Sequence, residues 1–290
     1  MKLRTLVVLV AVLCFALMAP AQSPSDYLDV MIVKVKPEKR ADFDQILRKI
    51  ADSNRKNKGD RWLTGETTYG EQNTIYFVST RKSYDEIEKS YDVFMAAMTK
   101  AMGQTAAMKL LQDFNSCTLG TRAEVRRRRW DLSVNAPADA TGQARLVAES
   151  RWYRTTTVRV RPGHVGAYEA LLKEIKEARE KKSSQVITLV SQAAAGQIGN
   201  VFYLTSLQKS LAGFDQPAAT IRELLGEEGF QRYQKVSQEA VLGTETVINR
   251  WVPEMSNPLD EYVSVSPDFW RPKPPAPAAK PKPEEPAKKP

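Results

Sequence analysis

Four consecutive arginines form the stretch whose residue types and spacing most directly suggest chemistry. They run from Arg126 to Arg129 as RRRR. Successive side chains of a strand point to opposite faces, so Arg126 and Arg128 are expected to share one face. Guanidinium groups match carboxylates and phosphates, which predicts that this pair binds an anion. The alternative is a charged, solvated strand that discourages edge-to-edge pairing.

One histidine, His164, and one thiol outside the N-terminal leader, Cys117, limit the remaining chemistry. They cannot complete a tetrahedral nitrogen and sulfur site, and the sequence has no Asp-x-Asp-x-Asp-Gly loop, so we predict no metal site. A haem ligand or general base usually needs an orienting partner, and none is near His164 in the sequence. We therefore predict no cofactor, a solvated His164 at a helix start and a buried, apolar Cys117.

Two large enzyme classes are also excluded. The sequence has no Gly-x-Ser-x-Gly elbow and no phosphate-cradling glycine loop. A Ser-His-Asp triad would have to use His164, which is expected at the start of a helix and is poorly placed there for proton transfer. These features argue against a serine hydrolase and a dinucleotide-dependent dehydrogenase.

The strands and helices that position the arginine run and His164 belong to an internal sequence repeat with two copies. The stretch VKVKPEKRADFDQIL, at 33–47, returns as VRVRPGHVGAYEALL at 158–172. Alternation before each proline predicts a strand, and apolar residues at i, i+3, i+4 and i+7 after it predict an amphipathic helix. Each copy therefore begins with a strand that leads into a helix.

The later elements repeat as well. The strand-like run TIYFVST, at 74–80, aligns with NVFYLTS at 200–206, and each forms a hairpin with the segment before it. Helical stretches follow at about 84–114 and 218–240, each broken once. The motif LGT, at 119–121 and 242–244, then begins a last strand that closes on Arg129-Trp130 in one copy and Arg250-Trp251 in the other. The repeated unit is βαββαβ.

This order is the ferredoxin-like plait, an antiparallel sheet with both helices on one face. We predict one plait over 27–136 and a second over 151–266, joined by a polar linker at 137–150. A signal peptide at 1–21 precedes them, and a disordered tail rich in Pro and Lys follows at 267–290. The open face of each sheet must be buried, and the other copy can cover it.

With this repeat, the sequence resembles the dimeric α+β barrel superfamily, which includes antibiotic-biosynthesis-monooxygenase-like, stress-responsive and NIPSNAP-like domains. The resemblance covers most of 27–266 and is one of pattern. It implies an α+β fold in which two tandem ferredoxin-like βαββαβ plaits pack sheet to sheet as an intrachain pseudo-dimeric barrel. No catalytic positions carry over from it.

The first strand of each copy indicates what such a barrel would contain. If Val158 and Val160 pack on the helices, alternate residues of the same strand face the interior. The first copy presents apolar residues there, whereas the second presents mostly polar ones. We therefore predict a ligand site for a small amphipathic or anionic molecule, unless side chains fill the interior. Its candidate residues are Tyr153, Thr155, Thr157, Arg159, Arg126 and Arg128.

The N-terminus and the charge distribution predict where the protein acts. Lys2 and Arg4 precede an apolar run and the small residues Ala19-Pro20-Ala21, the pattern of a secretory signal. The net charge is +9, but the leader and the residues after 270 carry most of it, so the folded part is only mildly basic. We predict a periplasmic or secreted protein with no membrane span in the mature chain and no nucleic-acid partner.

Two functional interpretations remain open. The first is an exported cell-envelope protein that binds a small ligand or has a structural role, with its basic tail attached to acidic envelope polymers. The second is an enzyme similar to cofactor-independent monooxygenases, or a haem-handling protein with His164 as the histidine candidate. The sequence favours binding over catalysis.

Overall fold

The computed structural model describes residues 26–215 and 219–272. The predicted signal peptide and most of the predicted tail therefore lie outside the described residues. The first repeat contains β1 (Tyr27–Val35), α2 (Arg40–Lys56), β2 (Leu63–Tyr69), β3 (Thr74–Arg81), α3 (Tyr84–Met102), α4 (Gln104–Ser116) and β4 (Thr118–Arg128). The second contains β5 (Trp152–Val160), α6 (Val165–Lys181), β6 (Leu189–Ala195), β7 (Asn200–Gln208), α7 (Ile221–Ala240) and β8 (Val241–Trp251).

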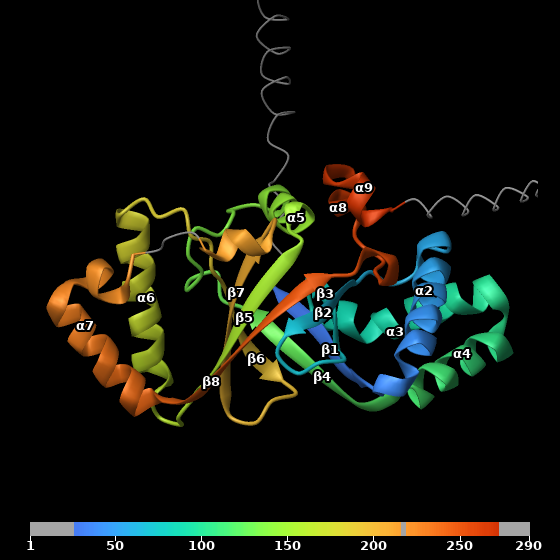
Figure 1. The fold of residues 1–290 in the computed structure, drawn as a ribbon, viewed down its shortest axis with the longest axis horizontal. Helices are drawn as coiled ribbons and strands as arrows, with labels where there is room; N and C mark the ends of the chain where they lie inside the picture. Colours follow the sequence, from blue (N-terminus) through green and yellow to red (C-terminus); the bar gives the residue numbers. More distant parts are fainter. Residues whose placement is uncertain (1–25, 216–218, 273–290) are drawn as a thin grey trace, which may run out of the picture.

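The eight strands close into one antiparallel barrel in the order β1-β3-β2-β8-β5-β7-β6-β4. Each plait contributes four consecutive strands, and the plaits join where β2 pairs with β8 and β4 pairs with β6. The helices of the two repeats lie on opposite sides of the barrel (Figure 1). The predicted fold, a pseudo-dimeric barrel of two ferredoxin-like plaits within one chain, is confirmed.

Strand register corrects two details of the predicted repeat. Val33 pairs with both Ile75 and Thr121, and the equivalent Val158 pairs with both Phe202 and Thr244. Ile75 therefore corresponds to Phe202, one residue away from the predicted alignment of 74–80 with 200–206. A one-residue shift exchanges the two faces of a strand, so the predicted alignment reversed which side chains face the helices.

The ends of the last strands need a separate correction, of two residues. The LGT motifs do align, because Thr121 and Thr244 are equivalent, but the ends of these strands do not align as predicted. Tyr27 pairs with Arg127, and Trp152 pairs with Arg250. Arg128 is therefore the counterpart of Trp251, and the sequence match between Trp130 and Trp251 is wrong.

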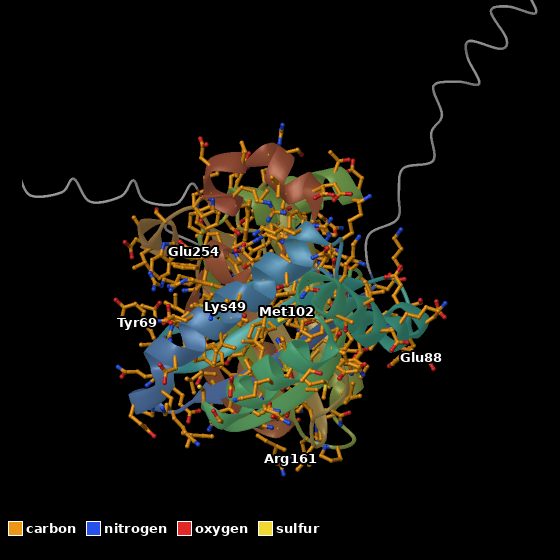
Figure 2. The ribbon with its side chains drawn as sticks, turned by 90° about the vertical axis from the view of Figure 1, so that its right-hand side faces the viewer. Lys49, Tyr69, Glu88, Met102, Arg161 and Glu254 are labelled. Atoms are coloured by element: carbon orange, nitrogen blue, oxygen red, sulfur yellow. The ribbon has the colours of Figure 1, made fainter. Side chains whose placement is uncertain are left out.

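The first repeat has a dense core between its sheet and its helices. Figure 2, viewed from the first-repeat side, shows α2 and α4 covering this face, with Lys49 and Met102 labelled. Phe43 stacks near Phe114 of α4, with ring centroids 5.1 Å apart, and Cys117 is buried beside them as predicted. The side chains that fill this core include Val33, Val35, Phe43, Leu47, Ile50, Ile75, Phe77, Met98 and Phe114.

A cap covers one end of the barrel. It consists of α5 (Ala140–Glu149), α8 (Asp260–Val265) and α9 (Pro267–Trp270), which meet above the strands (Figure 1). Trp270 is fully buried and donates its indole N–H to the Ala148 carbonyl at 3.0 Å. The segment predicted as a linker thus contains a helix, which Asp139 caps by accepting from the Gly142 N–H. Residues 267–270, which we assigned to the tail, form α9 because Trp270 anchors them.

None of the described helices is both long enough and apolar enough to cross a membrane.

Candidate functional site

All six predicted site residues line the interior of the barrel. Two small cavities lie along it, one beneath the cap and one toward the opposite end. The capped chamber, of about 100 Å³, is lined by Arg126, Arg128, Tyr153 and Thr155 together with cap residues such as Tyr262. The polar chamber, of about 90 Å³, is lined by Arg126, Tyr153, Thr155, Thr157 and Arg159. Val158 and Val160 face the helices, as predicted.

A buried carboxylate organises the boundary between the chambers. Glu124 is almost completely buried and forms ion pairs of 2.8 Å with both Arg122 and Arg126. It also accepts hydrogen bonds from the Tyr203 hydroxyl at 2.8 Å and the Gln197 amide at 2.6 Å. The Arg126 guanidinium lies 3.7 Å from the centre of the Tyr203 ring. Arg126 therefore has a carboxylate partner within the protein, which it shares with Arg122, and is not a free anion site.

Burial and neighbouring charges shift the pKa values of Glu124 and of the tyrosines around it. Desolvation opposes ionisation of Glu124, but Arg126, the Tyr203 hydroxyl and Arg122 together outweigh it and lower the pKa of Glu124. Desolvation raises the pKa of Tyr203 to about 12, and the pKa of Tyr153 is raised well above its ordinary value for the same reason. None of these groups has a pKa shifted toward neutrality, which a general acid or base would need.

The two chambers are too small for an ordinary organic ligand. A drug-sized molecule needs roughly 300–1,000 Å³. A water occupies about 30 Å³ of the liquid, so each chamber has space for about three waters. Side chains thus fill most of the barrel interior, which was the alternative to the predicted cavity for a small amphipathic ligand.

A larger cavity lies outside the barrel, between the sheet and the helices of the second repeat. This sheet–helix cavity has a volume of about 350 Å³ and was not predicted from the sequence. Its floor comes from β5, β7 and β8, and its walls come from α6 and α7. The lining residues include Leu132, Thr156, Val158, Tyr168, Leu171, Leu172, Ile175, Arg179, Leu204, Ile221, Tyr233 and Ser237.

The sheet–helix cavity exists because the second repeat has less helix to cover its sheet. In the first repeat, α3 and α4 bring Met98 and Phe114 onto the sheet. In the second, α7 alone takes their place, and its backbone is non-helical at Gly226. A shorter helical stretch after the hairpin of the second copy was visible in the sequence and would have been the signal for this space.

The lining is apolar except for one cation and a few hydroxyl groups. Arg179 occupies the position in α6 that the fully buried Asn54 occupies in α2. Burial lowers the pKa of Arg179, and among the described residues no acceptor or carboxylate pairs with its guanidinium. Tyr233 and Ser237 add hydroxyl groups from α7. The cavity can therefore hold an apolar body and pair with an anionic head group.

Haem does not fit these residues. The sole histidine, His164, is the N-cap residue of α6 and is not among the residues that line the sheet–helix cavity or either chamber. The sheet–helix cavity is near the lower limit for drug-sized ligands, and haem is a large ligand by that standard. Within 26–215 and 219–272, no cluster of His, Cys, Asp and Glu could hold a metal ion.

Comparison with known proteins gives similarity of fold at low sequence identity. No protein-family model matches the chain, and no curated protein matches it. Among solved structures, an anthrone oxidase-like protein aligns with a TM-score of 0.49 and 15% identity, over 80% of this chain and 94% of that one. A heme-binding protein from Thermus thermophilus aligns with a TM-score of 0.45 and 12% identity, over 82% and 95% of the two chains.

A third solved structure is chlorite dismutase from Candidatus Nitrospira defluvii, with a TM-score of 0.43 and 9% identity. That alignment covers 84% of this chain and 95% of the other. Similarity at this level does not transfer a site, so the function has to be judged from the residues of this chain.

Proposed function

We propose that this protein binds an amphipathic organic acid in the sheet–helix cavity, with the apolar part beneath α6 and α7 and the acid at Arg179. The observation that supports the proposal most strongly is an unpaired, partly buried guanidinium at the edge of an otherwise apolar cavity of about 350 Å³. An apolar cavity of about 150 Å³ holds benzene. The sheet–helix cavity is roughly twice as large, which suits about a dozen non-hydrogen atoms.

Binding is better supported than catalysis. None of the described residues that line the sheet–helix cavity is Asp, Glu or His. Tyr168, which does line it, has its pKa raised by burial and is a poor proton acceptor at neutral pH. A monooxygenase-like reaction without a cofactor would need a group that activates the substrate. The cavity offers a cation and hydroxyl groups, which orient a ligand but do not remove its proton.

Calorimetric titration of the full chain with decanoate and decanol tests the proposal, because the two ligands differ only in the head group. We expect decanoate to bind more tightly than decanol. Arg179→Met should lower decanoate affinity about tenfold or more and leave decanol binding unchanged, because a charged hydrogen bond is lost. Arg48→Met, which removes an exposed arginine from the equivalent helix α2, is the matched control.

Leu204→Trp tests the location of the site. Leu204 lies on the β7 floor of the cavity, so a larger side chain there should occupy the space and abolish binding of both ligands. Circular dichroism would establish that the variant is folded. Decanoate binding that survives in folded Leu204→Trp, or that is unaffected by Arg179→Met, would reject the sheet–helix cavity as the site.

We also propose that the protein is exported and acts in the periplasm or outside the cell. The support is the leader sequence with Lys2, Arg4 and the Ala19-Pro20-Ala21 pattern. Cell fractionation and the intact mass of the purified protein test this directly. Cleavage near residue 21 and recovery outside the cytoplasm are expected, whereas a full-length cytoplasmic product would refute export.

The basic tail is proposed to attach the exported protein weakly to acidic envelope polymers. Its charge comes from Arg271, Lys273, Lys280, Lys282, Lys288 and Lys289. Attachment by a few such groups is screened by salt. Deletion of 271–290 should therefore reduce envelope retention at low salt but not at high salt, and unchanged retention would eliminate this role.

A further inference from the structure

The capped chamber contains a group of polar side chains that plays no part in the proposed function. We propose that this chamber is a binding site for one small monovalent oxyanion, such as formate or nitrate, held by Arg128, Trp130 and Tyr153. All three residues line the chamber. The site is separate from the sheet–helix cavity, and the inference is independent of decanoate binding.

The chamber has an excess of positive charge at one residue. Three guanidinium groups line it. That of Arg61 is paired with Asp260 at 3.1 Å, and that of Arg126 is paired with Glu124 at 2.8 Å. Across the described part of the chain, Arg128 has no carboxylate partner. Arg61 and Arg126 each have a carboxylate partner, so among the described residues Arg128 is the guanidinium of this chamber that lacks a counter-ion.

No carboxylate of the described residues lies within ion-pair distance of Arg128, and the Asp26 carboxylate acts on it only from further away. The Arg128 Nε is buried and has no acceptor, and its guanidinium lies 5.0 Å from the centre of the Trp130 ring. Asp26 contacts it through the backbone, where the Asp26 carbonyl accepts from the Arg128 N–H at 2.7 Å. A buried cation without an acceptor is costly, and an anion in the adjacent space removes that cost.

Two neutral hydrogen-bond donors that line the chamber also favour an anionic ligand. The Trp130 indole nitrogen and the Tyr153 hydroxyl are both buried without a partner. Other indoles around the barrel do have acceptors: Trp62 donates to the Met255 carbonyl, and Trp251 donates to the Ser150 hydroxyl, each at 2.9 Å. The guanidinium, the indole and the phenol can all donate, so an oxyanion with several lone pairs satisfies them together.

The size and the asymmetry of the chamber define the ligand class. A volume of about 100 Å³ holds three or four non-hydrogen atoms, which fits formate or nitrate and excludes long organic acids. The counterpart of Arg128 in the second repeat is Trp251, so pseudo-symmetry supplies no second unpaired cation. One guanidinium in an aromatic chamber selects a monovalent anion.

Thermal unfolding of the full chain in formate tests the site, with chloride used to keep ionic strength constant. A ligand that binds only the folded state raises Tm with concentration. We expect this rise in the natural protein and in Arg127→Met, whose side chain is the outward-facing neighbour in β4. Arg128→Met should show no formate-dependent rise, and in formate-free buffer it should unfold at a higher Tm than the natural protein because an unpaired cation is gone.

Trp130→Phe is a second variant that keeps the aromatic ring and removes only the N–H. It should weaken formate binding about tenfold, measured as the higher formate concentration needed to give the same rise in Tm as in the natural protein. Absence of any formate effect in the natural protein, or an equal effect in Arg128→Met, overturns the proposal and leaves waters as the occupants. Decanoate titration of Arg128→Met should be unchanged, so that failure of this site is distinguishable from failure of the sheet–helix cavity.

Discussion

In the first repeat, two helices after the hairpin bring large side chains onto the sheet, whereas the second repeat has a single helix there and retains a cavity of about 350 Å³. The strands beneath are equivalent residue for residue. The difference therefore arises in the segment between β3 and β4, compared with that between β7 and β8. One copy of the plait provides a solid core, and the other provides space for a ligand.

The last strands show a second contrast, this time inside the barrel. The inward face of β4 carries Arg122, Glu124, Arg126 and Arg128, and the equivalent face of β8 carries Glu245, Val247, Asn249 and Trp251. Nearly all of the buried charge in the barrel interior thus comes from the first repeat. The repeated scaffold is symmetric, but its charged interior strand and its sheet–helix cavity each occur in one copy.

Equivalent aromatic residues give the largest expected effects on stability. Phe43 in α2 lies in the dense core, and Tyr168 is its counterpart in α6, beside the sheet–helix cavity. Phe43→Ala should cost about 4 kcal/mol of unfolding free energy, because it creates a new cavity. Tyr168→Ala should cost about half as much, because it enlarges a space that already exists. Urea unfolding measures both, and equal losses would contradict the difference in packing.

Replacing the buried carboxylate should have the next largest effect. Glu124→Gln keeps the shape of the side chain but leaves Arg126 without its counter-ion, which should cost about 3 kcal/mol at neutral pH. The counterpart in β8 is Val247, where Val247→Thr should cost about 1 kcal/mol through burial of a hydroxyl group. A smaller loss for Glu124→Gln than for Val247→Thr would show that the ion pairs do not hold the barrel interior together.

The loss of unfolding free energy in Glu124→Gln should depend on pH in a predictable direction. The pKa of Glu124 in the folded protein is lowered from 4.5, so its ionised form contributes stability above that pH. This contribution is lost as the pH falls through the lower, folded-state pKa. The stability difference between the natural protein and Glu124→Gln should therefore be constant near neutrality and shrink in acid. A difference that grew as the pH fell would contradict the ion-pair account.

The last comparison concerns the glycines at the two helix breaks. Gly103 separates α3 from α4 with φ of 81°, and Gly226 interrupts α7 with φ of 72°. Both have extended ψ values, a combination that is almost confined to glycine. Gly103→Ala and Gly226→Ala should each cost about 2 kcal/mol in thermal unfolding. A neutral Gly226→Ala would mean that α7 can straighten, and decanoate affinity should then change as well.

The sequence predicted the repeated units and the inward direction of Tyr153, Thr155, Thr157 and Arg159, because those follow from alternation and helical spacing. The closed barrel was implied by the resemblance to a superfamily of paired plaits. It did not predict register at β7 and β8. Val201, Phe202 and Tyr203 of β7 are all buried, so an alignment that is one residue wrong there still places apolar side chains on the helices. At the end of β8 the recurring Arg-Trp pair gave a match that is two residues wrong. The cap was missed because α5 and α9 are short and are stabilised by contact with Trp270 and not by periodicity.

The sequence placed its candidate ligand site inside the barrel and gave no position for the sheet–helix cavity. Alternation in β5 identified the side chains that face the barrel interior, but it could not show how completely neighbouring strands fill that space. The sheet–helix cavity depends on how much of the sheet α7 covers, and the shorter helical stretch of the second copy was the signal for it in the sequence. Arg179 was visible as a charged residue in an amphipathic helix, and only the comparison with the buried Asn54 shows that it is unusual.

A crystal structure of the full chain grown with decanoate tests the central claim most directly. We predict continuous ligand density between α6, α7 and the sheet of the second repeat, with the carboxylate within hydrogen-bonding distance of Arg179. An α7 that has moved onto the sheet and closed the space, or decanoate bound elsewhere with Arg179 in solvent, would contradict the account.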